Sequence, residues 1–149
     1  MHDRIDGQTG YLLVKLGGSA GARFERALAP LGMKGRHVRV LEILRNDPRS
    51  QSELCQETGM DRTTMVAVID ELERLGCVRR ERSLTDRRKH VVSMTERGGT
   101  ALGESAVLLT QAQDELLAPL SAAERDRLHA LLIRLYAQPP DPCAPLPPT

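Results

Sequence analysis

The sequence is poor in aromatic residues and contains no tryptophan. Tyr11, Phe24 and Tyr136 are the only aromatic residues among 149, which argues against a binding site that stacks a large aromatic ligand. Long apolar runs are also missing. None approaches the roughly 20 residues that a membrane helix needs, and the first residues lack the pattern of a secretory signal. We therefore expect a cytoplasmic protein.

Residue patterns typical of metal sites and of enzymes are missing too. The three cysteines, Cys55, Cys77 and Cys143, are odd in number and widely spaced, which argues against a disulfide framework and against a CxxC metal site. The four histidines fall in separate segments without metal-ligand spacing. Neither a nucleophile elbow nor a phosphate-binding glycine loop is found. The sequence predicts no enzyme, no metal and no cofactor.

The composition that remains is that of one globular domain, 1–149, with an uneven charge distribution. Hydrophobic residues make up 40% and charged residues 28% of the chain, and the net charge is only +1. Residues 79–89 nevertheless contain six basic and two acidic residues, whereas acidic residues prevail from Gly103 onward. One end of the molecule is therefore suited to bind an anion.

An apolar residue every fourth position predicts a helix over 9–28 near the start of the chain. Glycines within this helix each weaken it, so we expect a bend there or the close approach of another backbone. The apolar positions are Leu12, Leu16, Ala20, Phe24 and Leu28, and the glycines are Gly17, Gly18 and Gly21.

Two further helices are predicted near the end of the chain. Thr95 caps one that runs to about Leu117, and a capping box at 121–124 opens another that runs to about Ala137. Its apolar stripe consists of Leu128, Leu131, Leu132 and Leu135. The segment 138–149 holds six of the nine prolines, and we expect a disordered tail there.

The middle of the chain predicts a helix-turn-helix. A helix over about 35–45 comes first, with Val38, Leu41 and Leu44 inward. Ser50 and Glu53 then form a capping box for a short helix that Gly59 stops. Asp61 is a good N-cap for the next helix, over about 62–75, which Gly76 stops and which has a buried stripe of Met65, Val68, Ile69 and Leu72. Two helices joined by so short a turn form this motif.

A β-hairpin is predicted directly after the helix-turn-helix. Residues 78–84 and 89–94 are short runs of β-branched and basic residues, separated by a polar turn at 85–87. Val92 and Met94 alternate with Val91 and Ser93, so one face is expected to pack on the helix and the other to stay in contact with water. Such a hairpin is called a wing.

A helix-turn-helix beside a basic wing is suited to duplex DNA. The second helix of the motif enters the major groove with its first turns, where Arg62 can pair with guanine and threonine methyl groups can pack on thymine. The outward residues of this part are Arg62, Thr63, Thr64, Val66 and Ala67. Basic wing residues supply phosphate contacts and an arginine for the minor groove. The predicted DNA-binding residues are Gln51, Ser52, Arg62, Thr63, Thr64, Ala67, Arg79, Arg80, Arg82, Asp86, Arg87, Arg88 and Lys89, although Arg79, Arg80 and Arg82 also fit a merely solvated strand face.

Residues 9–137 resemble the MarR family of bacterial winged-helix repressors. The resemblance rests on DRTTMVAVIDELERLGCVRR followed by DRRKHVVSMTERG, and above all on the wing pattern of Asp86, Arg88, Met94, Thr95 and Gly98. It implies a mainly α fold with a small β wing, in which 35–95 form a winged helix-turn-helix lobe. The helices in 9–33 and 96–137 would form a dimerisation lobe. It also implies that Arg88 enters the minor groove and that Asp86 holds it.

Two positions depart from the family pattern. Ala67 stands where many relatives have an arginine, so base reading is expected to depend on Arg62, Thr63 and Thr64, with more selectivity from DNA shape. Lys34 and Gly35 replace the usual Ser or Thr followed by Pro, and we expect the second helix to begin more loosely.

The function expected from this sequence is that of a sequence-specific transcription regulator. It would bind double-stranded DNA with a pseudo-palindromic operator as a homodimer, act as a repressor and be released by a small molecule. Candidate ligand contacts are Tyr11, Arg36 and His37, where the first, second and fifth helices meet. Two alternatives remain: a cysteine-based redox-sensing regulator, and a winged-helix protein-interaction module. Cys55 is expected to be buried and inert.

Overall fold

The computed structural model describes residues 7–138 and consists of six α-helices, one 3-10 turn and two strands in that range. The predicted disordered tail, apart from residue 138, lies outside the described residues. The helix bounds agree with the sequence prediction to within one or two residues, and β1 is shorter than expected. The elements are α1 (Thr9–Leu28), η2 (Ala29–Leu31), α2 (Gly35–Leu44), α3 (Gln51–Thr58), α4 (Arg62–Arg74), β1 (Val78–Arg82), β2 (His90–Met94), α5 (Glu96–Leu116) and α6 (Ala122–Tyr136).

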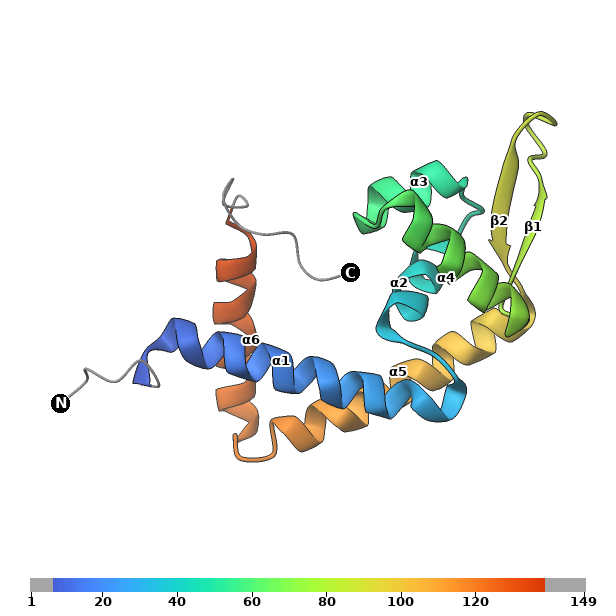
Figure 1. Ribbon diagram of the computed structural model, residues 1–149. Helices are drawn as coiled ribbons and strands as arrows, with labels where there is room; N and C mark the ends of the chain where they lie inside the picture. The colour runs from blue at the N-terminus through green and yellow to red at the C-terminus, as the bar shows by residue number, and fades with distance from the viewer. Residues whose placement is uncertain (1–6, 139–149) are drawn as a thin grey trace.

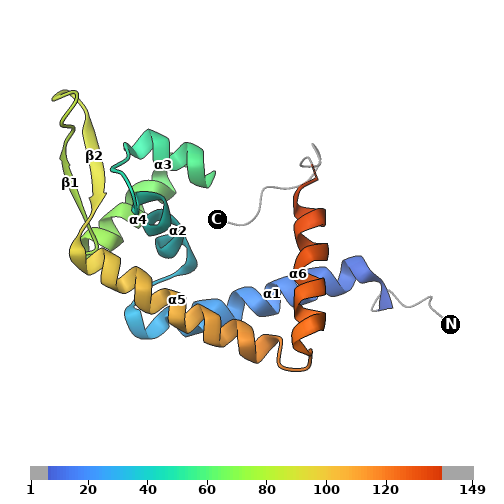
Figure 2. The same cartoon turned by 180° about the vertical axis from the view of Figure 1, so that it is seen from behind.

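The molecule has two lobes connected by two long helices (Figures 1 and 2). Helices α1 and α5 lie side by side and run in opposite directions. The winged lobe, α2 to β2, sits at the end where α1 finishes and α5 begins. Helix α6 stands at the other end of the pair. This mainly α architecture with a small β wing confirms the predicted fold class. No helix in 7–138 is long and apolar enough to cross a membrane.

The hydrophobic core lies mostly in the winged lobe. The predicted stripe of α4 is fully buried, and it packs with the inward side of α2 and with Leu54 of α3. Val38 is only half-buried, whereas His37 and Val40 face inward on α2. Leu28 at the end of α1 and Leu102 on α5 extend the core toward the helical lobe.

The apolar stripes of α1 and α6 are largely exposed in the single chain. Leu12 is 46% and Leu16 55% exposed, and only Leu28 of the α1 stripe is buried. Helix α6 buries no residue at all. Both helices extend beyond the winged lobe (Figure 1), and Phe24 and Leu128 are half-buried while the other leucines of the two stripes stay exposed, apart from Leu28.

The predicted bend or close approach at the α1 glycines is not found within the chain. Helix α1 is continuous from Thr9 to Leu28. A Cβ added at Gly17, Gly18 or Gly21 would meet nothing within 4 Å. These glycines therefore give α1 a smooth, open surface on that side.

The wing is an antiparallel ribbon in which Val78 pairs with Met94 and Arg82 with His90. A third segment, unpredicted, joins it: Arg49 and Val92 exchange backbone hydrogen bonds of 3.0 and 2.7 Å. The expected alternation along β2 is also imperfect. Ser93 is buried, and its hydroxyl is satisfied by donating to Glu81 Oε1 across the ribbon at 2.5 Å.

The junction between the wing and α5 explains why Thr95 is followed by Gly98 in the wing pattern. Thr95 caps α5 by accepting the Gly98 amide at 3.1 Å, and its hydroxyl donates to the Gly76 carbonyl at 2.6 Å. A Cβ on Gly98 would lie 2.1 Å from the Cys77 carbonyl oxygen. Only glycine fits here, because backbone atoms cannot yield as a flexible side chain can.

The start of α2 is firmly held, contrary to the expectation of a looser end. The Gly35 amide donates to Glu25 Oε1 of α1 at 2.9 Å, and the Lys34 amide donates to His37 Nδ1 at 3.0 Å. Two of the free amides of the helix N-terminus are thus satisfied without the usual hydroxyl cap. A carboxylate beside a helix N-terminus is also electrostatically favourable.

Candidate nucleic-acid interface

The reading surface begins at the N-terminus of α4. Gly59, with φ of 76°, ends α3 in the left-handed conformation and turns the chain toward Asp61. Asp61 accepts the Thr64 amide at 2.8 Å and the Thr64 hydroxyl at 3.2 Å. The bond from that amide lowers the pKa of Asp61. The cap fixes the first turn of α4, and Arg62, Thr63, Val66 and Ala67 face solvent from it.

Helix α3 supports this surface from behind. Its N-terminus is the predicted capping box: Ser50 Oγ accepts the Glu53 amide at 3.2 Å, and Glu53 Oε2 accepts the Ser50 amide at 2.6 Å. Gln51 is half-buried and Ser52 is exposed at the first two positions of α3. The capping box is confirmed, and contact of these two side chains with DNA stays a prediction.

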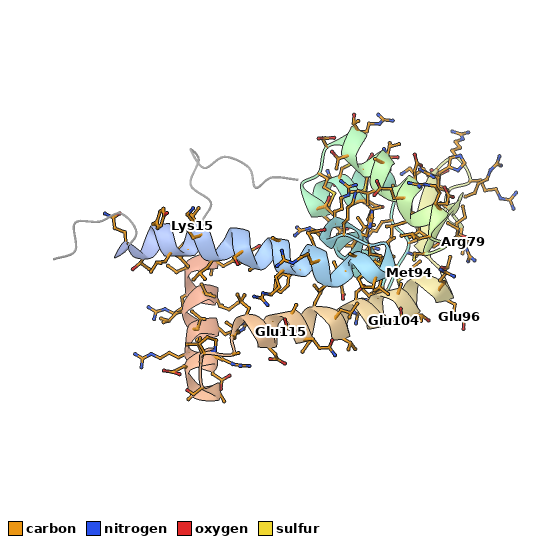
Figure 3. The ribbon with its side chains drawn as sticks, turned by 60° about the horizontal axis from the view of Figure 1, so that its bottom comes forward. Lys15, Arg79, Met94, Glu96, Glu104 and Glu115 are labelled. Carbon is orange, nitrogen blue, oxygen red and sulfur yellow. The ribbon has the colours of Figure 1, made fainter. Side chains whose placement is uncertain are left out.

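The basic residues of the wing divide into paired and unpaired ones. Arg80 binds the carboxylates of Asp70 and Glu73 on α4. Arg79 lies 3.1 Å from Glu81 on its own strand. Its position at the winged end of the molecule, far from Lys15 on α1, is visible in Figure 3. Among residues 7–138, no carboxylate lies within ion-pair distance of Arg82, Arg87, Arg88 or Lys89.

The turn of the wing is shaped by Asp86. Its Oδ1 accepts the backbone amide of Arg88 at 3.0 Å, while Ser83 Oγ accepts the Thr85 and Asp86 amides at 3.3 and 3.4 Å. Asp86 thus holds the backbone of Arg88, and no ion pair joins the two side chains in the described structure. The guanidinium of Arg88 is exposed and free to enter a groove.

Two of the three predicted ligand contacts belong to an internal network. Arg36 donates to both oxygens of Glu71 at 2.9 and 3.0 Å, and His37 Nε2 lies 2.6 Å from Glu71 Oε2. The hydrogen bond from Arg36 lowers the pKa of Glu71 to about 2. Burial lowers the pKa of His37, against the raising effect of Glu71. Since Nδ1 accepts an amide, His37 is neutral here and Nε2 donates.

The third predicted ligand contact, Tyr11, does not join Arg36 and His37 within one chain. It lies 17 residues before Leu28 on α1, which is about 25 Å along a helix axis. Lys15 Nζ lies over the Tyr11 ring, 5.5 Å from the ring centroid. Within the chain, the structure therefore does not assemble the predicted trio into one site.

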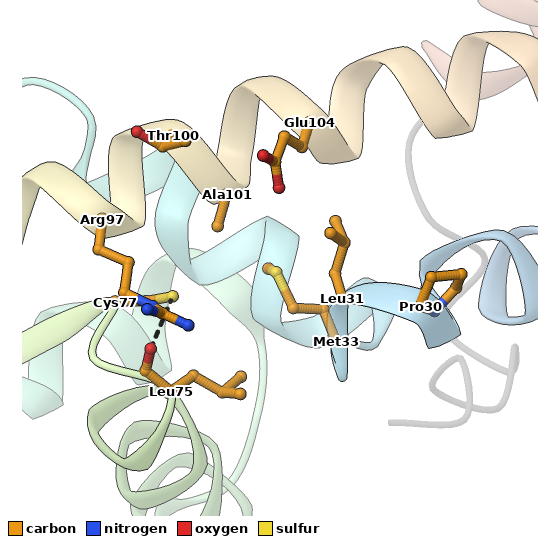
Figure 4. A pocket seen from close by; sticks show the side chains of 9 residues that line it. All are labelled: Pro30, Leu31, Met33, Leu75, Cys77, Arg97, Thr100, Ala101 and Glu104. Atoms are coloured by element: carbon orange, nitrogen blue, oxygen red, sulfur yellow. Dashed lines mark hydrogen bonds between the residues drawn. The ribbon is translucent and has the colours of Figure 1, made fainter.

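A hollow of about 360 Å³ lies where η2, the end of α4 and the start of α5 meet (Figure 4). Apolar side chains form much of its lining, and Arg97 and Glu104 of α5 contribute one charge of each sign. Its size falls in the lower range for small-molecule sites. Its lining residues are Pro30, Leu31, Met33, Leu75, Cys77, Arg97, Thr100, Ala101 and Glu104.

The structure describes two of the three cysteines, and both are at least partly buried. Cys77 is 2% exposed, and burial raises the pKa of its thiol, which opposes formation of the reactive thiolate. Cys55 packs half-buried against the core, which corrects the expectation of full burial. Cys143 lies outside the described residues.

Sequence reasoning missed several residues that position this surface. Glu25, Arg49 and Glu71 act through partners at least ten residues away or on another element, and no local pattern indicates such pairing. The outward position of Val66 was visible from the helical period, but a valine there carried no recognised signal.

The fold and the surface together define a class of protein. A capped helix with an open polar N-terminus, beside a basic hairpin, is the arrangement of winged helix-turn-helix DNA-binding proteins. Comparison with known proteins narrows the class. A family model described as MarR family matches residues 31–89. A protein from Thauera aromatica, named as a transcriptional regulatory protein for the hcr operon, is 33% identical over 140 residues, 93% of this chain and 84% of that relative.

Solved structures agree. A transcriptional regulator from Pseudomonas aeruginosa is 29% identical with a TM-score of 0.73, covering 89% of this chain and 99% of its own. The transcriptional repressor CouR bound to a 23-mer DNA duplex is 29% identical with a TM-score of 0.77, covering 91% and 97%. The chain belongs to the MarR family of DNA-binding transcriptional regulators.

Proposed function

We propose that this protein is a homodimeric repressor that binds a pseudo-palindromic operator and leaves it when a small molecule binds. One observation carries the proposal: the free first turn of α4 and the unpaired basic turn of the wing lie in one lobe, with α3 behind them. The helix would read base edges in the major groove while the wing follows the adjacent backbone. Such a protein works in the cytoplasm, where bacterial DNA lies.

Fewer residues are proposed here to contact DNA than the sequence alone predicted. Arg62 and Thr63 remain accessible on α4, and Arg82, Arg87, Arg88 and Lys89 remain without carboxylate partners among the described residues. Arg80 is better explained as a link between wing and helix. Thr64 shares its hydroxyl with the Asp61 cap, so its part in base reading is secondary. Gln51 and Ser52 would bind the backbone from the start of α3.

Exposed apolar side chains support the homodimer. Leu131, Leu132, Ile133 and Leu135 of α6 are each 40 to 53% exposed, and Leu12, Leu13, Val14 and Leu16 of α1 are 41 to 73% exposed. Exposed apolar surface of this extent marks an interaction site. A second copy of the chain would cover it by symmetry. Two reading helices would then face two half-sites about one helical turn apart.

Release by a small molecule is supported by the hollow between the lobes. A ligand bound to Arg97 and Glu104 there would touch both the end of α4 and the start of α5, and would favour one spacing of the reading helices. CouR from Rhodococcus jostii RHA1, 23% identical with the same fold, is solved bound to p-coumaroyl-CoA. In Bordetella bronchiseptica BpsR, 6-hydroxynicotinic acid regulates DNA binding.

The wing offers the sharpest test. Operator sites selected from random DNA are titrated by fluorescence anisotropy in a salt series, with the wild type and the Arg88→Ala variant. We expect a steep loss of affinity with salt, and for the variant about a tenfold weaker specific binding with a salt slope smaller by about 1. Lys15→Ala, which removes a cation at the far end of α1, is the matched control. Unchanged specific binding in Arg88→Ala would refute the wing assignment.

The same titration separates the two other functions. A protein-interaction module would give weak binding without a preferred sequence, whereas a regulator binds its site well above the nonspecific background. A redox-sensing regulator would lose operator affinity on peroxide treatment. Its variant with serine in place of the cysteines would keep that affinity under the same treatment. The buried thiol of Cys77, with its raised pKa, argues against that mechanism.

A further inference from the structure

Only two large apolar side chains of the winged lobe are exposed in the described residues. The other exposed ones lie on α1, α5 and α6, where a second copy would cover them. In the winged lobe they are Val66, 38% exposed on α4, and Leu84, fully exposed in the wing. Dimerisation gives no reason for either. The exposure of Val66 on α4 is therefore not accounted for by the dimer.

Val66 lies on the part of α4 that would enter the major groove. It follows Arg62 by four residues and Thr63 by three, so all three side chains share one face of the helix. The neighbours Met65, Val68 and Ile69 turn inward and are fully buried. A valine in a helix lowers helix propensity, and 38% of the Val66 surface stays in contact with water. An apolar partner outside the chain would cover that remaining surface.

The apolar group that DNA presents in the major groove is the 5-methyl of thymine. The two methyl groups of Val66 match it in kind, and Arg62, one turn earlier, is placed for a guanine next to it. One turn later, Asp70 would repel phosphates, but Arg80 pairs with it and with Glu73. Arg80 thereby offsets part of the repulsion that would oppose close approach beyond Val66.

We infer that Val66 is a specificity-determining residue that packs on the methyl group of one thymine in each half-site. The inference rests on the proposed function, because it requires α4 to lie in the major groove. Together, Arg62 and Val66 would select a thymine close to a guanine. The small side chain of Ala67 leaves room for this contact beside it.

Removing single methyl groups from the operator tests the inference. Each thymine of the selected site is replaced in turn by deoxyuridine, which lacks only the 5-methyl, and the affinity is measured for the wild type and for Val66→Ala. We expect one thymine per half-site at which the wild type binds about fourfold more weakly, the value for losing one buried methyl group. Val66→Ala removes the contact in both half-sites, so it should bind the unmodified operator about sixteenfold more weakly and ignore that replacement.

Leu84→Ala is the matched control, because it shortens the other exposed apolar side chain of the lobe. It should keep the full response to deoxyuridine. Alanine favours helix more than valine does, so weaker binding by Val66→Ala cannot come from a disrupted α4. If the wild type and Val66→Ala respond equally at every thymine, the inference is wrong while the proposed function stands. If no specific site is bound at all, the proposed function fails first.

Discussion

At the scale of single residues, the most consequential side chain is His37. It is buried, its Nδ1 closes the start of α2, and its Nε2 contacts Glu71 on the recognition helix. Glu25 joins the same helix start from α1. A single imidazole thereby connects the N-terminus of α2 to α4, next to a contact from the helical lobe. Because Nδ1 accepts an amide, a second proton on the ring would break this link.

Stability should therefore fall as the pH drops below about 6.5. The pKa of His37 is lowered in the folded protein, so the unfolded chain takes up the proton first, and each such proton lowers stability by up to about 1.4 kcal/mol per pH unit. Glu71, with a pKa of about 2, acts the same way only below its ordinary value of 4.5. Urea unfolding between pH 7.5 and 5 at constant protein concentration measures the slope.

The His37→Asn variant provides the control for this pH dependence. Asparagine can still accept the Lys34 amide but does not titrate, so its unfolding free energy should vary less between pH 7.5 and 5. It should also be about 2 kcal/mol lower at neutral pH, because Glu71 loses a charge-assisted partner. An equally steep pH profile in the variant would assign the effect to other groups.

At the scale of elements, the link between β1 and α4 gives Arg80 a different role from the one that the charge pattern suggested. Its guanidinium bridges Asp70 and Glu73, so the strand is tied to the helix and part of the negative charge of the two carboxylates is offset. The ion pairs are partly exposed and contribute little to stability, on the order of 1 kcal/mol or less. Their effect on DNA binding should be larger.

We expect Arg80→Met to weaken operator binding about fivefold, because it leaves Asp70 and Glu73 to repel phosphates at a few ångströms. The decisive variant adds Asp70→Asn and Glu73→Gln, and it should regain most of the lost affinity. If Arg80 instead contacts phosphate directly, neutralising its partners will restore nothing. Anisotropy titrations of the three proteins distinguish the two roles, with thermal unfolding as the check on folding.

The element boundaries could be predicted from the sequence because their signals are local. Ser50, Asp61, Thr95 and Ser121 each cap the helix that follows by accepting the amide three residues on. The bridge between Arg49 and Val92 and the triad of Arg36, His37 and Glu71 could not be predicted, because their members are 34 to 43 residues apart. The helical period of the sequence located the apolar stripes of the helices. It does not tell whether a stripe packs inside its own chain or against a second molecule.

At the scale of the whole molecule, two surfaces of opposite character lie at opposite ends. The winged end carries unpaired cations, while α1 and α6 present leucines, and Glu104 and Glu115 line α5 between them (Figure 3). Dimerisation through the leucines would place the two winged ends at a fixed separation. Binding both half-sites at once raises affinity by 10²- to 10⁴-fold over binding one.

Charging the leucine surface should therefore abolish operator binding without unfolding the chain. In the variant Leu131→Glu with Leu135→Glu, both changes lie on exposed positions of α6, one turn apart. We expect sedimentation to show one copy and operator affinity to fall at least a hundredfold, while circular dichroism keeps the helical signal. Leu84→Glu, the same change in the wing, should stay dimeric. A double variant that still sediments as two copies would place the interface elsewhere.

The position of the exposed leucines in the chain has a consequence for how the protein is made. Among residues 7–138, α1 is the first helix to be synthesised and α6 the last, so a dimer surface made of both would be completed only after α6 has been made. Until a second chain arrived, the apolar faces of both helices would be open to chaperones and to proteases. The cellular level of such a regulator would then set its own half-life, because a chain that finds no partner is the one that is degraded.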